Sequence, residues 1–165
     1  VFQLSSRPML LVKDDIYVKA INRVMVAIDK SEASQYCLDL ALFLLKDIKG
    51  GELILAHVMT DLKSPSAETA QLNSDKHPIL EAATKKAQML GVSSRSILSI
   101  GKPGEKICNL AEEMNADLLL VGSPDRRPSI AKNFVDLDKL IGTSLSDYVR
   151  INASCPVLLA RTAAA

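Results

Sequence analysis

The chain has 165 residues, the usual size of one domain, and 48% of them are apolar, which is enough to build a substantial core. Its 20 lysine and arginine side chains nearly balance 19 aspartate and glutamate side chains, so the net charge is only +1. A protein with so small a net charge lacks the strong positive electrostatic potential that attracts nucleic acid. No apolar run approaches the ~18 residues of a membrane span. We therefore expect neither nucleic acid nor a membrane as a partner.

The three cysteines, Cys37, Cys108 and Cys155, are far apart in the sequence and form no CxxC pair. An odd number of cysteines without such a pair argues against a disulfide framework and against a zinc site. We expect buried free thiols, because cysteine is among the most buried residue types. This usage fits a reducing compartment, so we expect a cytoplasmic protein.

Hydrophobic periodicity divides residues 23–161 into alternating strands and helices. Short apolar runs such as "RVMVAI" favour strands, and Ser31 is a suitable N-cap for the helix after the first strand. Glycines follow two of the helices and are expected to end them. The predicted elements are strand 23–28, helix 32–47, strand 52–58, helix 79–90, strand 94–100, helix 104–115, strand 116–123, a helix from Thr143 or Ser144 to Ile151, and strand 155–161.

This β-α-β-α-β-α-β-α-β order, in which every strand reads as buried, predicts an α/β fold: a five-stranded parallel open sheet with helices on both faces. The polar stretch 60–78 has no sustained period and is expected to be a long loop. The domain should span residues 21–162. Residues 1–20 precede it as an N-terminal extension, in which "MLLVKDDIYVKA" is either an extra edge strand or an arm onto a partner.

The candidate site follows from the sheet. In an open parallel sheet, ligands bind beyond the carboxyl ends of the strands, where the strand order reverses. Asp29 follows the first predicted strand, where a carboxylate either accepts hydrogen bonds from ribose hydroxyls or an adenine amino group, or only caps the next helix. Gly122 allows close approach of a ligand or a sharp turn. Gly142, Thr143 and Ser144 open a helix whose N–H groups attract an anion, unless they are an ordinary N-cap.

Motifs for dedicated catalysis are missing from the sequence. Neither a Walker loop nor GxGxxG is present, and no acid–base pair or Ser-His-Asp arrangement is legible. His57 and His77 lack a nearby nucleophile or metal-ligand spacing, so we expect core or surface roles for them. We therefore expect no enzyme activity beyond slow, incidental hydrolysis of ATP.

Three segments give the chain a family resemblance: "RVMVAIDKSEAS", "GKPGEKICNLAEEMNADLLLVGS" and "GTSLSDYVRINASCPVLLAR". In order and character they resemble the universal stress protein family over about residues 21–161. The resemblance implies a nucleotide site formed by Asp29, the backbone around Val58, Gly122 and the helix start at 142–144. It also implies a homodimer in which the last strand, 155–161, pairs across a two-fold axis. The apolar run "PVLLA" fits that use, and it equally fits an edge buried under residues 1–20.

ATP-binding members of this family carry a glycine, two residues, a second glycine, nine residues, and then glycine with serine or threonine. Gly122 matches the first glycine, and Gly142 with Thr143 matches the last pair. Asp125 occupies the second glycine position, and the sixteen residues 126–141 stand where the pattern has nine. Both ends of the expected phosphate cradle are therefore present, and its middle is altered.

The altered middle leaves two readings open. Asp125 either repels phosphates and blocks close approach of the backbone, or holds a Mg²⁺ ion that bridges to them. Arg126 either grips a phosphate through two bonds or lies in a solvated loop. Mg²⁺ is expected only together with a bound nucleotide. Because the adenosine half keeps Asp29, AMP and ADP are expected as readily as ATP.

Two functions from different classes follow. The first is a homodimeric stress-response regulator that binds an adenine nucleotide. The alternative is a dimeric stress or scaffold protein that binds no nucleotide and acts through protein contacts of the altered loop.

Overall fold

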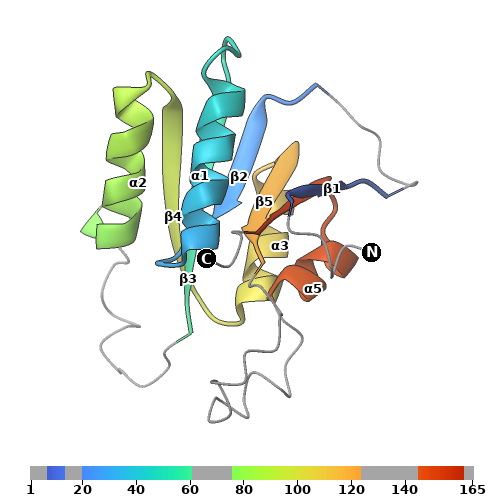
Figure 1. The fold of residues 1–165 in the computed structure, drawn as a ribbon. Helices are drawn as coiled ribbons and strands as arrows, with labels where there is room; N and C mark the ends of the chain where they lie inside the picture. Colours follow the sequence, from blue (N-terminus) through green and yellow to red (C-terminus); the bar gives the residue numbers. More distant parts are fainter. Residues whose placement is uncertain (1–6, 14–19, 61–75, 124–144, 162–165) are drawn as a thin grey trace.

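The computed structural model describes residues 7–13, 20–60, 76–123 and 145–161. Within these residues, six strands form one sheet in the order β1-β6-β5-β2-β3-β4, with helices on both faces (Figure 1). The elements are β1 (Met9–Leu11), β2 (Arg23–Ala27), α1 (Glu32–Leu45), β3 (Glu52–Met59), α2 (Pro78–Met89), β4 (Ser93–Ile100), α3 (Pro103–Glu113), β5 (Leu118–Gly122), α5 (Leu145–Asn152) and β6 (Val157–Ala160).

The five strands β2 to β6 run parallel, which confirms the predicted α/β fold. β2 lies in the middle, with β3 on one side and β5 on the other. The chain builds β3 and β4 outward from β2, then returns through α3 to place β5 on the opposite side. The strand order therefore reverses between β2 and β5, which is where ligands bind in open sheets of this kind.

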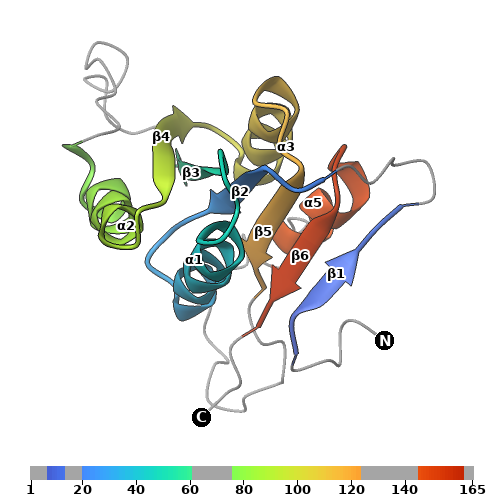
Figure 2. The same ribbon diagram turned by 90° about the horizontal axis from the view of Figure 1, so that it is seen from above.

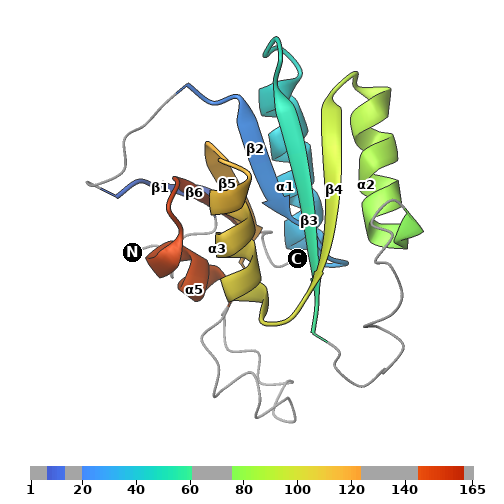
Figure 3. The same ribbon diagram turned by 180° about the vertical axis from the view of Figure 1, so that it is seen from behind.

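Side chains alternate between two cores along each central strand. Seen from above, α1 and α2 cover one face of the sheet, whereas α3 and α5 cover the other (Figure 2). Figure 3 shows α3 and α5 in front of the sheet when it is seen from behind. Val24 and Val26 belong to the core that includes residues of α1 and α2, and Met25 between them belongs to the core that includes residues of α3 and α5. All three side chains are completely buried. Burial on both faces explains why these strands read as continuous apolar runs.

The helix ends follow from local chemistry. Ser31 is the N-cap of α1, as predicted, and its hydroxyl oxygen accepts a hydrogen bond from the Ser34 N–H at 3.2 Å. Prolines stand at the first position of α2 and α3, where no N–H is needed. Gly91 directly follows the C-cap of α2 with φ of 69°, the left-handed conformation that ends a helix, whereas Gly50, with φ of 74°, lies in the turn after the end of α1. Among the described helices, none combines the length and apolar character needed to cross a membrane.

β4 differs from the prediction that every strand is buried. It lies at the edge of the sheet and pairs only with β3 among the described strands. None of its residues is fully buried. The difference arises because an edge position is a tertiary property: one side of β4 has no neighbouring strand among the described residues, and its serines accommodate partial exposure.

The other edge of the sheet is formed by β1, part of the predicted N-terminal extension. β1 runs antiparallel to β6, with Leu10 opposite Leu158. Of the two alternatives for this extension, residues 9–11 therefore form the extra edge strand. They cover the strand edge that was assigned to a homodimer through residues 155–161.

Candidate functional site

The carboxyl ends of β2, β3 and β5 bring predicted site residues together at the reversal of strand order. Asp29 lies two residues beyond β2, and Gly122 is the last residue of β5. The side chain of His57, near the end of β3, reaches the end of β2: its Nδ1 lies 2.7 Å from the Ile28 carbonyl oxygen. The chain after β2 and the start of α1 thus border one region with the end of β3.

The turn after β2 fixes the Asp29 carboxylate through one of its two oxygens. Oδ1 accepts hydrogen bonds from the Ser31 N–H at 2.7 Å and the Ser34 hydroxyl at 2.8 Å. The Ser34 hydroxyl oxygen also accepts the Asp29 N–H at 3.1 Å, and the Gln35 side chain donates to the Asp29 carbonyl at 3.0 Å. Within the described chain, Oδ2 receives no such bond, so it is available to a ligand.

These bonds keep Asp29 ionised. Partial burial alone would raise the pKa of its carboxyl group. The hydrogen bonds from Ser31 and Ser34, with a smaller contribution from His57, outweigh burial and lower this pKa below its ordinary value. Of the two roles considered for Asp29, the turn and helix-start role is observed for Oδ1. Oδ2 of the ionised carboxylate can therefore accept hydrogen bonds from a ligand.

A hollow of about 570 Å³ opens beside Asp29. Its size suits a small organic ligand, since such sites are typically ~300–1,000 Å³. Lys30 adds a cation at its rim, and the two histidines place aromatic rings in its wall. The residues that line the hollow are Asp29, Lys30, Ser31, His57, His77, Pro78 and Ile79.

His57 and His77 lie side by side in the structure. From the sequence alone, we expected only core or surface roles for them. Their ring centroids are 4.7 Å apart, with the ring planes inclined at 37°. Because a carbonyl oxygen only accepts, the contact with Ile28 puts the proton of neutral His57 on Nδ1 and leaves Nε2 as an acceptor. Burial lowers the pKa of His77, and the nearby His57 and Lys30 lower it further. His77 is therefore expected to be neutral at pH 7.

Gly122 serves helix packing as well as the site. A Cβ added there would lie 2.9 Å from the carbonyl carbon and Cβ of Ala33, and 2.9 Å from the backbone nitrogen of Ser34. The glycine thus lets the first turn of α1 approach β5 closely, and this turn carries Ser34, which holds Asp29. Beyond Gly122, the buried hydroxyls of Ser123 and Ser146 are 3.4 Å apart and connect β5 to α5.

The remaining predicted site residues are not assembled here. Val58 is partly buried against the α3 and α5 core, and the hollow is lined instead by His57 before it. Asp125, Arg126, Gly142, Thr143 and Ser144 lie outside the described residues. Sequence reasoning missed the role of Ser34, although its position three residues after the Ser31 N-cap is a recognisable helix-start signal.

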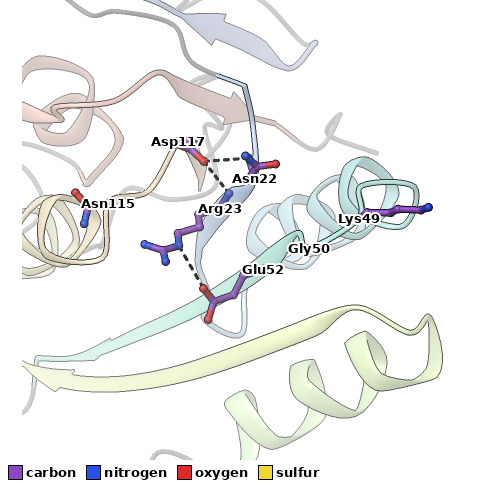
Figure 4. Close-up of a pocket in the computed structure, with 7 residues that line it drawn as sticks. All are labelled: Asn22, Arg23, Lys49, Gly50, Glu52, Asn115 and Asp117. Carbon is purple, nitrogen blue, oxygen red and sulfur yellow. Dashed lines mark hydrogen bonds and ion pairs between the residues drawn. The ribbon is translucent and has the colours of Figure 1, made fainter.

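A second hollow, of about 510 Å³, lies at the amino ends of the strands (Figure 4). Its two carboxylates already have partners. Asp117 accepts hydrogen bonds from the Asn22 and Arg23 N–H groups at 2.9 and 2.8 Å, and Glu52 pairs with Arg23 at 3.5 Å and with Arg95 at 3.1 Å. Asp117 thus ties the start of β5 to the start of β2, which is a structural role.

The described residues contain no group of three or more His, Cys, Asp or Glu side chains arranged to hold a metal ion. Cys37, Cys108 and Cys155 are free and buried, as predicted. What the first hollow offers is an ionised carboxylate oxygen, an imidazole acceptor, aromatic faces and one lysine. These groups suit a ligand with hydroxyl groups, a flat ring and negative charge.

Comparison with known proteins agrees with this geometry. The model of the universal stress protein family matches residues 20–161. A universal stress protein of Bacillus subtilis, YxiE, is 30% identical in an alignment 155 residues long that covers 85% of this chain and 99% of the relative.

Solved structures share the fold. A universal stress protein from Archaeoglobus fulgidus superposes with a TM-score of 0.71 at 24% identity, covering 98% of this chain and 52% of its own. A universal stress protein in complex with cAMP gives 0.62 at 24% identity, covering 88% and 100%. An Arabidopsis thaliana family protein with AMP bound gives 0.60 at 20%, covering 87% and 93%. The chain belongs to the universal stress protein family.

Proposed function

We propose that this protein binds an adenine nucleotide in the hollow beside Asp29 and acts as a nucleotide-responsive stress regulator. One observation carries the proposal: Asp29 is held ionised by bonds to Oδ1, while Oδ2 receives no hydrogen bond within the described chain. A carboxylate oxygen in this position accepts hydrogen bonds from the two hydroxyls of a ribose. The complexes of two structural relatives with cAMP and AMP support an adenine nucleotide as the ligand class.

The imidazole rings of His57 and His77 in the wall of the hollow offer contacts for the adenine base. The imidazole rings present flat faces, and because Nδ1 of His57 faces the Ile28 carbonyl, its Nε2 is the nitrogen left for an exocyclic amino group. Lys30 at the rim attracts a phosphate. AMP needs only these groups. A triphosphate also needs the cradle between Gly122 and Ser144, where Asp125 and the longer loop alter the family pattern, and Mg²⁺ would enter only with those phosphates.

The proposed role is binding and signalling, because the hollow presents no nucleophile paired with a base. We further propose that the active unit is a homodimer. The alternative, a scaffold protein that binds no nucleotide, is motivated by Asp125 and the extended loop, and the same experiment tests it.

Calorimetry with AMP, ADP, ATP and cAMP, with and without Mg²⁺, tests the proposal. We expect micromolar binding by the wild type. Asp29→Ala should weaken it by about 10–100-fold, since a hydrogen bond to a charged group contributes ~1.5–3 kcal/mol. Asp47→Ala, at an exposed position just beyond the far end of α1, is the matched control and should bind normally. Silence from every nucleotide, with a folded protein, would leave the scaffold alternative.

A further inference from the structure

The outer edge of β6 is occupied by the chain's own N-terminal segment. β1 pairs antiparallel with β6 in the register Met9 to Leu159, Leu10 to Leu158 and Leu11 to Val157. Figure 2 shows β1 as the last strand of the sheet, beside β6. The segment is short, and Leu10 remains 56% exposed.

This pairing has the symmetry of a dimer contact. Two copies of one strand related by a two-fold axis run antiparallel, which is the direction that β1 takes on β6. The register is centred on Leu158. A second copy of Val157–Leu159 laid in the place of Met9–Leu11, in the same chain direction, would put Leu158 opposite Leu158 and each Val157 opposite Leu159.

The side chains of β1 also resemble those of the β6 strand that a second copy would supply. β1 reads Met-Leu-Leu, and the β6 triplet that it would stand in for reads Val-Leu-Leu. Leu11 therefore occupies the position that Leu159 of a second copy would take, and it packs against the core between the sheet and α3 and α5. β1 presents nearly the same apolar triplet to β6 that a second copy of the chain would present.

We propose that Met9–Lys13, here called the arm, is an exchangeable edge strand that occupies in the single chain the surface through which a second copy binds. The partner is a second β6, and the arm must leave before the two strands pair. The inference rests on the homodimer of the proposed function, and it adds that residues 9–13 control dimer formation.

Lys13 fastens the arm. Its ammonium group donates hydrogen bonds to the carbonyl oxygens of Ile151 and Ala153, at 2.5 and 3.0 Å, where α5 ends. A cation is favourable there because the last carbonyls of a helix lack helical partners and carry the negative end of its dipole. With only three residues in the ladder, this contact is a large part of what holds the arm in place.

The expected size of the effect follows from competition. The apparent dissociation constant of a ligand rises in inverse proportion to the fraction of molecules in the competent state. The arm must leave β6 in both protomers, so the apparent dissociation constant of the dimer is the intrinsic constant divided by the square of the fraction of chains with an open arm. If the arm is open in about one molecule in ten, the dimer is about 100-fold weaker than it would be without the arm. Loosening the arm should therefore strengthen the dimer.

A disulfide lock tests the proposal on the full chain. Residues 10 and 158 are directly opposite, and Cβ atoms of such pairs are ~4.5–5.5 Å apart, so Leu10→Cys with Leu158→Cys should oxidise within one chain. We expect sedimentation to give a monomer for the oxidised protein at every concentration, and a concentration-dependent dimer after reduction. Leu10→Cys alone is the control for random cross-linking. A locked chain that dimerises as well as the reduced chain would overturn the proposal.

A charge reversal tests it from the other side. Lys13→Glu should loosen the arm and tighten the dimer at least ~10-fold, whereas Lys49→Glu, at an exposed position in the turn between α1 and β3, should leave it unchanged. Deletion of residues 1–13 should have the larger effect. If Lys13→Glu and the deletion both sediment as monomers at the highest soluble concentration, the proposal is wrong.

The natural cysteines report arm opening without reference to dimer mass. Lys13 is close enough to influence the thiols of Cys108 and Cys155, whereas Cys37 lies on the opposite face of the sheet. Loss of the Lys13 cation by itself disfavours the Cys155 thiolate, so the faster labelling of Cys155 that we expect in Lys13→Glu would report exposure and not charge, and Cys37 should stay unlabelled. Neither sedimentation nor labelling involves nucleotide, so failure of this inference is distinguishable from failure of nucleotide binding.

Discussion

Gly122→Ala is a small change with a large expected effect, because the new methyl group meets backbone atoms. Its Cβ would lie 2.9 Å from Ala33 and Ser34, whereas unstrained carbon contacts are ~3.5–4.0 Å. No side-chain rotation relieves the overlap, so α1 must shift by more than half an ångström from β5. Overpacking of this kind typically costs ~1–3 kcal/mol, and the loss of chain freedom in the unfolded state returns ~0.4–1 kcal/mol.

The net destabilisation should therefore be about 1–2 kcal/mol. Urea unfolding followed by circular dichroism would show it as a lower midpoint, by roughly 0.5–1 M if the slope is ~2 kcal/mol/M. The cost should shrink in an Ala33→Gly background, since one of the three short contacts is then removed. A midpoint within ~0.2 M of wild type would refute the packing argument. Nucleotide binding should also weaken, because the displaced turn holds Asp29.

Three further predictions concern other parts of the chain. Asp117→Ala should destabilise the protein by ~1–2 kcal/mol in urea unfolding, since the Asn22 and Arg23 N–H groups lose a charged acceptor; an unchanged midpoint would deny its role in tying β5 to β2. The pKa of Asp29 is lowered in the folded state, so its contribution to stability is present above the ordinary carboxyl pKa and lost as pH falls through the folded value. Thermal unfolding from pH 6 to pH 2 should show a smaller loss of stability in Asp29→Asn than in the wild type, because the other carboxylates still titrate in both proteins. Burial raises the pKa of the Cys37 thiol to about 12, so thiol reagents should label it at pH 8 only on unfolding; rapid labelling of the native protein would contradict its place in the core.

The parallel sheet was predictable because its central strands are buried on both faces and a glycine follows the end of α2. Both signals are local: an apolar run specifies a buried strand, and a left-handed residue specifies a helix end. β1 was not predictable to the same degree. Three residues are too few for a periodic signal, and whether they pair with β6 depends on a strand almost 150 positions away.

The site was predictable in part for a similar reason. The position of Asp29 follows from the end of β2, but the sequence presented its two roles as alternatives. The structure shows the turn role at Oδ1, to which Ser31 and Ser34 donate, and leaves Oδ2 for the proposed ligand role. The histidine pair was missed, since twenty residues separate His57 from His77 and only the fold brings the rings together.

The same pair allows the most direct test of the central claim. The chain contains two histidines, and both line the hollow beside Asp29. We would titrate AMP into the untagged protein and follow the imidazole C–H signals by NMR, assigning them with His57→Gln and His77→Gln. We expect both signals to shift together and saturate in the wild type, and to stay unchanged in Asp29→Asn at the same AMP concentrations. Imidazole signals that do not respond while calorimetry registers AMP binding would place the nucleotide elsewhere and contradict the account.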